Sequence, residues 1–322
     1  MEAIFIGGTG RSGTTIFKHI LSQHQQISSL PFEARIIIDP GGALDLIDHL
    51  SDCWTPYNAD IALYNFLKLT VNCQQTSLLN KVLARLISYV GVTPFRYPGV
   101  GIGSAIGQRN YRSQLNTLIN ALNIRENHGY WGGSVPFQLS KVIYEVGPFA
   151  RDEVSKMVAD FVVGIFSNNA TETATHWLDD TPYNFLQAHR LKKIFPKMKL
   201  LHIYRDPRDV TASYRTKVWG GRDISVIANR INGILNQWFI IKEGLSDSLY
   251  AEFSLEKISE KPRKYLSEIC KFLEIPFDER LLNIKLNHVN AGRWLKDLSL
   301  KEQSQVNRIL SSHINAMGYS RM

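Results

Sequence analysis

The chain has 322 residues, of which 44% are hydrophobic, so it is long and apolar enough to bury a sizeable core and is not a disordered chain. The net charge of +8 and the pI near 9.3 favour an acidic ligand, nucleic acid or an anionic surface, although no polybasic run stands out. The three cysteines, Cys53, Cys73 and Cys270, have neither metal-ligand nor C-x-x-C spacing. An odd count without such spacing fits a reducing compartment.

The sequence also bears on where the protein resides. It has no stretch of 18 or more apolar residues, so we expect no membrane span. The first apolar run begins at Ala3, which leaves no room for a signal peptide. We therefore expect a soluble, cytoplasmic protein.

The N-terminus has the pattern of a strand, a glycine-rich turn and a helix. Ala3–Ile6 is a short apolar run of the kind that a buried parallel strand shows. Gly7–Gly13 predicts a tight turn, and Thr14–Gln23 carries apolar residues at helical spacing. The free amide groups of this predicted helix would point at the glycine turn, so an anion belongs there.

From Gly41 to Glu172 the pattern becomes mainly helical, with glycine- and proline-rich joints. We predict a helical insertion that covers the substrate side of a sheet. Its aromatic residues, among them Trp54 and Trp131, fit either core packing or contact with an aromatic or glycan ligand. Helices are predicted at Ile61–Val71, Leu78–Val90, Tyr111–Leu122 and Glu153–Ser167.

An alternating strand and helix pattern returns after the insertion. Strands are predicted at His176–Asp179, Lys199–Tyr204 and Leu249–Ala251. Together these elements predict an α/β fold, a P-loop-type parallel sheet flanked by helices, in a single domain of residues 1–322. The accompanying helices are predicted at Thr181–Phe195, Asp209–Val218, Ile224–Glu243, Arg263–Leu273 and Leu300–Ile314.

The glycine turn fits two familiar nucleotide motifs incompletely. Gly8-x-Gly10-x-x-Gly13 satisfies the dinucleotide fingerprint, with Glu33 about twenty residues on, but the intervening residues 27–32 make a poor strand. As a Walker A loop, the segment has Thr14 where the lysine should stand. Without that lysine, the β- and γ-phosphates of a nucleotide lose their main positive partner, so hydrolysis of a nucleoside triphosphate is disfavoured.

A second segment, Leu200–Tyr214, also has the features of a phosphate site. Arg205 comes at the end of the predicted strand and Ser213 lies about two turns into the following helix, so both can reach one phosphate. Pro207 fits the start of that helix, and Asp209 could cap it or place favourable negative charge at its start. Alternatively, the arginines and aspartates of Arg205–Asp209 form internal ion pairs on a surface turn.

The first segment, Gly10 to Thr15, resembles the 5′-phosphosulfate loop of sulfotransferases that use 3′-phosphoadenosine 5′-phosphosulfate (PAPS). It is closest to the R-S-G-T-T form of the tyrosylprotein and related bacterial branches. The resemblance implies that Arg11 contacts the bridging or sulfuryl oxygens. It also implies that the 5′-phosphate lies against Gly10, Ser12, Gly13, Thr14 and Thr15.

The second segment resembles the 3′-phosphate element of the same family, which implies that Arg205 and Ser213 hold the 3′-phosphate. Tyr250 begins a segment that is similar to the one after the family's last core strand, and we include it among the cofactor-binding residues. Asn290–Trp294 resembles the C-terminal glycine–basic segment that closes over the nucleotide, which makes Arg293 a candidate second contact.

Glu33 and Arg11 are the catalytic residues that the resemblance implies. Glu33, two residues before Arg35, looks like the glutamate that deprotonates the acceptor hydroxyl in tyrosylprotein sulfotransferases. The alternative is an ion pair of Glu33 with Arg35 or Arg11. Where that branch often has Lys-Thr-Pro, this chain has Asp180-Thr181-Pro182, so a lysine is missing and Asp180 becomes a second candidate base.

We expect a sulfotransferase that moves a sulfuryl group from PAPS to the hydroxyl of a carbohydrate, phenol or other small molecule by in-line transfer, leaving 3′-phosphoadenosine 5′-phosphate (PAP). The partner is a small-molecule or glycan acceptor. Neither nucleic acid nor a metal is expected. The alternatives are a P-loop nucleotide kinase or phosphotransferase and a non-catalytic nucleotide-binding module. The identity of the acceptor and the oligomeric state stay open.

Overall fold

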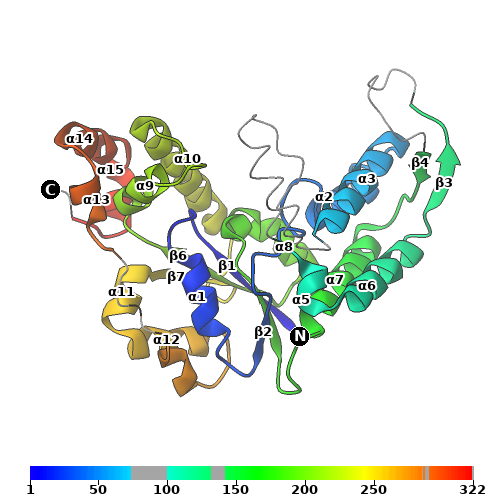
Figure 1. Cartoon of the computed structure of the whole chain (residues 1–322), viewed down its shortest axis with the longest axis horizontal. Coiled ribbons are helices and arrows are strands. Elements are labelled where there is room, and N and C mark those ends of the chain that lie inside the picture. Colours follow the sequence, from blue (N-terminus) through cyan, green and yellow to red (C-terminus); the bar gives the residue numbers. More distant parts are fainter. Residues whose placement is uncertain (74–99, 132–141, 285, 287–289, 321–322) are drawn as a thin grey trace. The chain divides into compact units, whose positions relative to one another are not determined.

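The computed structural model describes residues 1–73, 100–131, 142–284, 286 and 290–320 (Figure 1). The chain forms two compact units. The sheet unit consists of Glu2–Ile27, Thr173–Lys192 and Lys197–Met322. The helical unit consists of Met1, Ser28–Glu172 and Lys193–Pro196, so it begins earlier than the predicted insertion. The assignment of one domain to residues 1–322 stays a prediction.

A five-stranded sheet has β1 at its centre, with the strand order β2-β5-β1-β6-β7. β1 pairs in parallel with β5 and β6, and β6 pairs in parallel with β7, so the predicted α/β fold with a parallel sheet is confirmed. Residues 27–32, predicted as a poor strand, contribute only the three residues of β2. The strands are β1 (Glu2–Gly7), β2 (Ile27–Ser29), β5 (His176–Asp179), β6 (Lys199–Tyr204) and β7 (Tyr250–Ser254).

Both faces of the sheet are covered, as a parallel sheet requires. On one face Ile4 and Ile6 belong to a buried cluster with residues of α1, α11 and α12. On the other face the ring of Phe5 meets that of Trp177 edge to face, with 5.2 Å between centroids. Alternation of side chains along β1 thus places its residues in two different parts of the core.

The helices accompanying the strands follow the prediction closely, and Ile224–Glu243 has the predicted bounds. The predicted helix Thr181–Phe195 begins instead as a 3₁₀ turn, and Leu300–Ile314 divides at Leu310 into two helices. These elements are α1 (Thr14–Leu21), η1 (Pro182–Gln187), α8 (Ala188–Ile194), α9 (Pro207–Arg215), α10 (Ile224–Glu243), α11 (Leu255–Glu260), α12 (Pro262–Phe272), η2 (Glu279–Leu282), α13 (Arg293–Asp297), α14 (Leu300–Ile309) and α15 (Ser311–Ala316).

The helical unit contains packed helices and a two-stranded antiparallel ribbon that the sequence did not predict (Figure 1). α3 packs on α7 in part through Phe66 and Phe161, whose ring centroids lie 5.8 Å apart. The predicted helix Leu78–Val90 lies outside the described residues. The elements are α2 (Ala43–Leu50), α3 (Pro56–Asn72), α5 (Ile102–Ile106), α6 (Gln108–Ala121), β3 (Arg125–His128), β4 (Val142–Glu145) and α7 (Arg151–Ser167).

Across the described ranges, no helix combines the length and the apolar character needed to cross a bilayer.

Candidate functional site

The glycine turn after β1 has two positions, Gly10 and Gly13, at which a side chain would not fit. Gly10 has φ +71°, and a Cβ on it would lie 2.3 Å from the hydroxyl oxygen of Tyr214. Gly13 has φ +102°, and a Cβ on it would lie 2.8 Å from a methyl carbon of Leu255. The Tyr214 hydroxyl also donates a hydrogen bond to the carbonyl of Thr9 at 2.8 Å, so α9 holds this turn directly.

α1 begins at this turn with its N-terminal amide groups uncapped by any side chain. Gly13 is the N-cap residue and offers no side-chain hydrogen bond, and the first turn contains no acidic residue. The first amide groups of a helix have no partner within the helix, and the helix dipole makes this end favourable for negative charge. The helix start is therefore suited to an anion from outside the chain.

The second predicted phosphate segment lies directly against the first. Arg11, on the glycine turn, donates through Nε to the hydroxyl oxygen of Ser213 in α9 at 3.2 Å. Arg205 follows the last residue of β6, and β6 is the neighbour of β1 in the sheet. Two segments some 200 residues apart in the chain thus meet at the carboxyl ends of adjacent parallel strands, where ligand sites of open α/β sheets lie.

The internal ion pairs considered from the sequence are also present. Arg208 bonds Asp206 at 2.7 Å, and its guanidinium lies over the ring of Trp294, 4.3 Å from the centroid, so this arginine has a structural role. Arg205 is paired with Asp209 at 3.3 Å. Arg205 is only 7% exposed, yet its Nε has no hydrogen-bond partner within the described part of the chain.

Asp209 ties Arg205 to the C-terminal turn at Asn290–Trp294. This fully buried carboxylate accepts hydrogen bonds from the amides of Gly292 at 2.8 Å and Trp294 at 3.0 Å, in addition to its contact with Arg205. The carbonyl of Asn290 accepts a further bond from Arg205 at 2.6 Å. The predicted capping role belongs instead to Asp206, which accepts from the amide of Arg208.

A cavity of about 260 Å³ opens between these elements. Among the described residues, its lining holds three arginines and no acidic residue, so these residues give it a positive field. Seven of the predicted cofactor-binding residues line it: Arg11, Gly13, Thr14, Thr15, Arg205, Ser213 and Arg293. The other lining residues are Ile16, Leu255 and Asn290.

Three predicted contacts do not line the cavity. Gly10 packs against Tyr214, and Ser12 is fully buried with its hydroxyl unpaired among the described residues. Tyr250 does not belong to the cavity: it is the first residue of β7 and pairs in register with Leu200 near the start of β6. It therefore lies at the edge of the sheet opposite Arg205.

Glu33 lies in the helical unit, where it forms an ion pair with Arg35. Arg35 has φ +64° and also lies 3.6 Å from a carboxylate oxygen of Asp39. The pairing with Arg35 that the sequence left open is thus present, and the role of Glu33 as a base stays a prediction.

Asp180, the second candidate base, is fully buried and pairs with Lys18 of α1 at 3.1 Å. Burial, and then the charge of Asp179, raise its pKa, while the charge of Lys18 opposes that rise. Lys18 was missed from the sequence, although it falls on the core-facing stripe with Thr14, Phe17 and Leu21. Neither Asp180 nor Glu33 is among the described residues that line the cavity, but Asp180 is fully buried against Lys18 whereas Glu33 is partly exposed, which disfavours Asp180 as a base.

Where the chain is described, no group of three or more His, Cys, Asp or Glu residues is arranged to hold a metal ion. The described lining of the cavity combines three guanidinium groups with hydroxyls and one amide and contains no carboxylate, which favours an anion over a cation.

Part of this chain is similar to a known family. Residues 148–279 match the model of the sulfotransferase family, which confirms the resemblance to sulfotransferases but not to a particular branch; the matched stretch includes Arg205 and Ser213. An uncharacterized protein of Aquifex aeolicus (strain VF5) is 24% identical over 136 residues, which are 39% of this chain. The match spans only 17% of that protein's length.

The chain also resembles solved structures. The sulfotransferase domain from the Synechococcus PCC 7002 olefin synthase is 15% identical, with a TM-score of 0.47, and the match covers 100% of this chain and 95% of that domain. The sulfotransferase domain from the curacin biosynthetic pathway is 14% identical, with a TM-score of 0.48 and coverage of 100% and 99%.

Proposed function

We propose that this protein is a sulfotransferase that uses PAPS as donor and an acceptor hydroxyl as nucleophile. The observation that carries the proposal is the hydrogen bond between Arg11 and Ser213, which joins the two phosphate segments around one cavity. The family match over residues 148–279 supports the same reaction class.

The residues of the cavity suit a donor with phosphate at both ends. The uncapped start of α1 and the hydroxyls of Thr14 and Thr15 suit the 5′-phosphosulfate. The unpaired Nε of buried Arg205 and the hydroxyl of Ser213 suit the 3′-phosphate. Arg293 adds charge at the same cavity, although Asp297 already accepts from its Nε at 2.8 Å.

PAPS supplies the sulfuryl group when bound: the acceptor oxygen bonds to sulfur as the bond from sulfur to the 5′-phosphate oxygen breaks, and that oxygen keeps the electron pair. Arg11 is placed to offset the charge that develops on the 5′-phosphate, which a positioned guanidinium can do without a metal. Its bond to Ser213 orients the guanidinium.

The proton released by the acceptor hydroxyl goes to a base, for which we propose Glu33. Its ion pair with Arg35 fixes the carboxylate, and a held carboxylate can act as a general base. The nucleotide kinase alternative lacks the loop lysine, and Lys18 cannot replace it because its ammonium is buried against Asp180.

The test is to incubate the protein with PAPS and pools of hydroxyl acceptors and to measure PAP and the sulfated product. We expect PAP to form with at least one pool, and Arg11→Ala to lower kcat by about a hundredfold because one charge-stabilising donor is lost. Glu33→Gln should lower kcat similarly, whereas Arg112→Ala, at an exposed arginine of α6, should not. Transfer from ATP instead of PAPS would overturn the proposal.

A further inference from the structure

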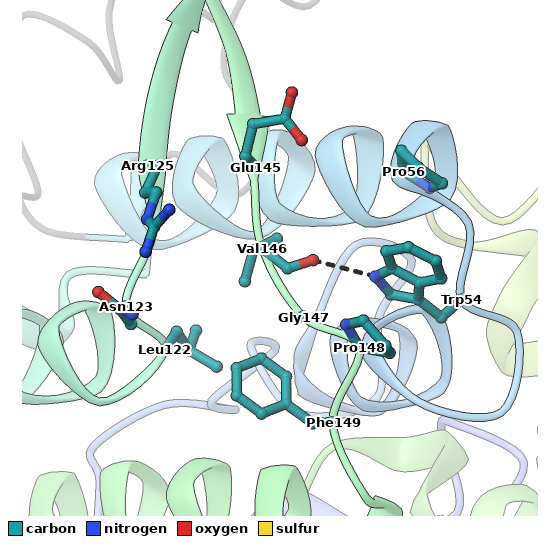
Figure 2. Close-up of a pocket in the computed structure, with 10 residues that line it drawn as sticks. All are labelled: Trp54, Pro56, Leu122, Asn123, Arg125, Glu145, Val146, Gly147, Pro148 and Phe149. Carbon is teal, nitrogen blue, oxygen red and sulfur yellow. Dashed lines mark hydrogen bonds between the residues drawn. The ribbon is translucent and has the colours of Figure 1, made fainter.

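A second cavity, of about 390 Å³, lies within the helical unit (Figure 2). Four segments form it: the turn between α2 and α3, the end of α6, the end of the β3–β4 ribbon at which β3 begins and β4 ends, and the stretch Val146–Phe149 that leads to α7. Its volume falls in the range of small-molecule sites, about 300–1,000 Å³.

Aromatic and other apolar side chains share the walls of this cavity with polar groups. Trp54 comes from the turn between α2 and α3, and Pro148 and Phe149 come from the stretch that leads to α7 (Figure 2). The indole nitrogen of Trp54 donates to the carbonyl of Val146 at 3.0 Å. Because its only hydrogen-bond donor is used, Trp54 is held in place and offers a ligand only the surface of its ring.

Two side chains of opposite charge, Arg125 and Glu145, line the cavity and do not form an ion pair with each other. Arg125 and Glu145 face each other across the antiparallel ribbon as paired residues, and both side chains are exposed. Neither side chain has an ion pair or hydrogen bond to another described residue. Figure 2 shows why: the guanidinium of Arg125 points toward Asn123, whereas the carboxylate of Glu145 points away from Asn123.

These charges select among classes of ligand. An anion would gain from Arg125 but would be repelled by Glu145, and a cation would meet the reverse. A neutral ligand with several hydroxyls can accept from the guanidinium, donate to the carboxylate and bond the amide of Asn123. A flat face of C–H groups on the same ligand can lie against the aromatic rings.

We propose that this cavity binds a neutral carbohydrate ring, with its C–H face against Trp54 or Phe149 and its hydroxyls on Arg125, Glu145 and Asn123. A sugar ring combines a neutral charge, many hydroxyls and an apolar face in a molecule of this size. The binding of the sugar stands on the cavity alone. Its role as part of the sulfuryl acceptor rests on the proposed function.

The test is saturation-transfer NMR followed by calorimetry on the full chain, with neutral hexoses, N-acetylhexosamines and disaccharides as probes. We expect binding at millimolar concentrations and a loss of about tenfold in affinity for Arg125→Gln and for Glu145→Gln, because a hydrogen bond to a charged group is lost in each. The matched controls Arg112→Gln and Glu153→Gln, at exposed positions of α6 and α7, should bind as the wild type does.

Three results would overturn the inference: no binding of any neutral probe, binding that neither substitution weakens, or an anionic sugar that binds the wild type more tightly than any neutral sugar does. PAP binding is measured on the same samples. A protein that binds sugars but not PAP would refute the proposed function and leave this site intact, and the reverse result would refute only the site.

Discussion

At the scale of single residues, the candidate site depends on how one buried arginine is held. Arg205 has two acceptors, the carboxylate of Asp209 and the carbonyl of Asn290, while its Nε has no partner in the described chain. A buried guanidinium with an unused donor is costly unless a ligand satisfies it. Arg205 is therefore positioned by the protein and keeps one donor for the anion that we propose as its ligand.

Asp209 is the residue that positions Arg205 and the turn before α13. In Asp209→Asn, three donors would face a side chain that has only one acceptor oxygen, so one amide or guanidinium group loses its partner. We expect affinity for PAP to fall about tenfold and stability by about 1–3 kcal/mol, measured by calorimetry and urea unfolding.

The control for this change is Asp223→Asn, at the N-cap of α10. It should reduce stability slightly and leave PAP affinity unchanged. In an Arg205→Ala background, Asp209→Asn should weaken PAP binding much less than it does in the wild type. Equal losses of affinity in both backgrounds would show that Asp209 does not act through Arg205.

At the scale of elements, the start of α1 and the network beneath β6 and β7 carry separate functions. The first presents amide groups to the cavity through a glycine backbone. The second joins strands to α10 through Glu252, which accepts hydrogen bonds from His202 and Trp238 at 2.8 Å and from Lys242 at 2.9 Å. We therefore expect the first to serve binding and the second to serve stability.

Gly13→Ala tests the helix start. The φ of +102° disfavours any side chain, and the new methyl group would displace Leu255, which lines the cavity. We expect at least a tenfold loss of PAP affinity in calorimetry. Gly233→Ala in α10 is the control, since nothing lies within 4 Å of its Cβ position, and it should bind PAP normally and be slightly more stable. Unchanged PAP binding by Gly13→Ala would contradict a role for this turn.

The Glu252 network predicts a pH dependence of stability. Burial alone would raise the pKa of Glu252, but the hydrogen bond and charge of His202, with the bonds from Trp238 and Lys242, lower it to about 2. A lowered carboxyl pKa contributes stability that is complete above the unfolded value, near pH 4.5, and is lost as pH falls toward 2.

The measurement is denaturant unfolding from pH 7 to pH 2 for the wild type and Glu252→Gln. The stability advantage of the wild type, a few kcal/mol at neutral pH, should shrink through this window. Glu243→Gln, at an exposed position of the same helix, should follow the wild type throughout. An advantage that stays constant down to pH 2 would contradict the account.

At the scale of the whole molecule, the sheet unit contains every described residue that lines the cavity of about 260 Å³. One long segment of the helical unit, Ser28–Glu172, interrupts the sheet unit in the sequence. The two ends of the interruption lie side by side, because the amide of Thr175 donates to the carbonyl of Gln26 at 3.0 Å. Two buried clusters of hydrophobic side chains consist only of residues of the sheet unit.

Replacing residues 28–172 by a short glycine–serine linker should therefore leave a folded protein that binds PAP within several-fold of the wild-type affinity. Sulfuryl transfer should be abolished, because Glu33 is removed. Circular dichroism and calorimetry check the first expectation, and PAP release checks the second. A well-folded product that does not bind PAP would show that the helical unit is needed for the donor site.

Much of the sheet unit could be predicted because its strands are visible as apolar runs in the sequence. Buried parallel strands are continuous apolar runs, so β5 and β6 have the predicted bounds. The β3–β4 ribbon could not be predicted, since all four residues of β3 are polar and exposed. Asn290 reaches Arg205 through its backbone carbonyl, which leaves no signal in the side-chain pattern. Tyr250 lies at the opposite end of the strands from Arg205, which a sequence motif alone cannot tell, and its role as a cofactor contact stays a prediction.

The measurement that tests the central claim most directly is calorimetric titration of the full chain with PAP, beside AMP, ATP and NAD, repeated on Arg205→Ala and on the exposed-site control Arg222→Ala. The account predicts that PAP binds more tightly than AMP, which lacks the 3′-phosphate, and more tightly than ATP or NAD. It also predicts that Arg205→Ala weakens PAP by at least tenfold, brings it near AMP, and leaves AMP binding little changed, while Arg222→Ala matches the wild type. Equal affinity for PAP and AMP in the wild type, or a preference for ATP or NAD, would contradict the assignment of this cavity to PAPS.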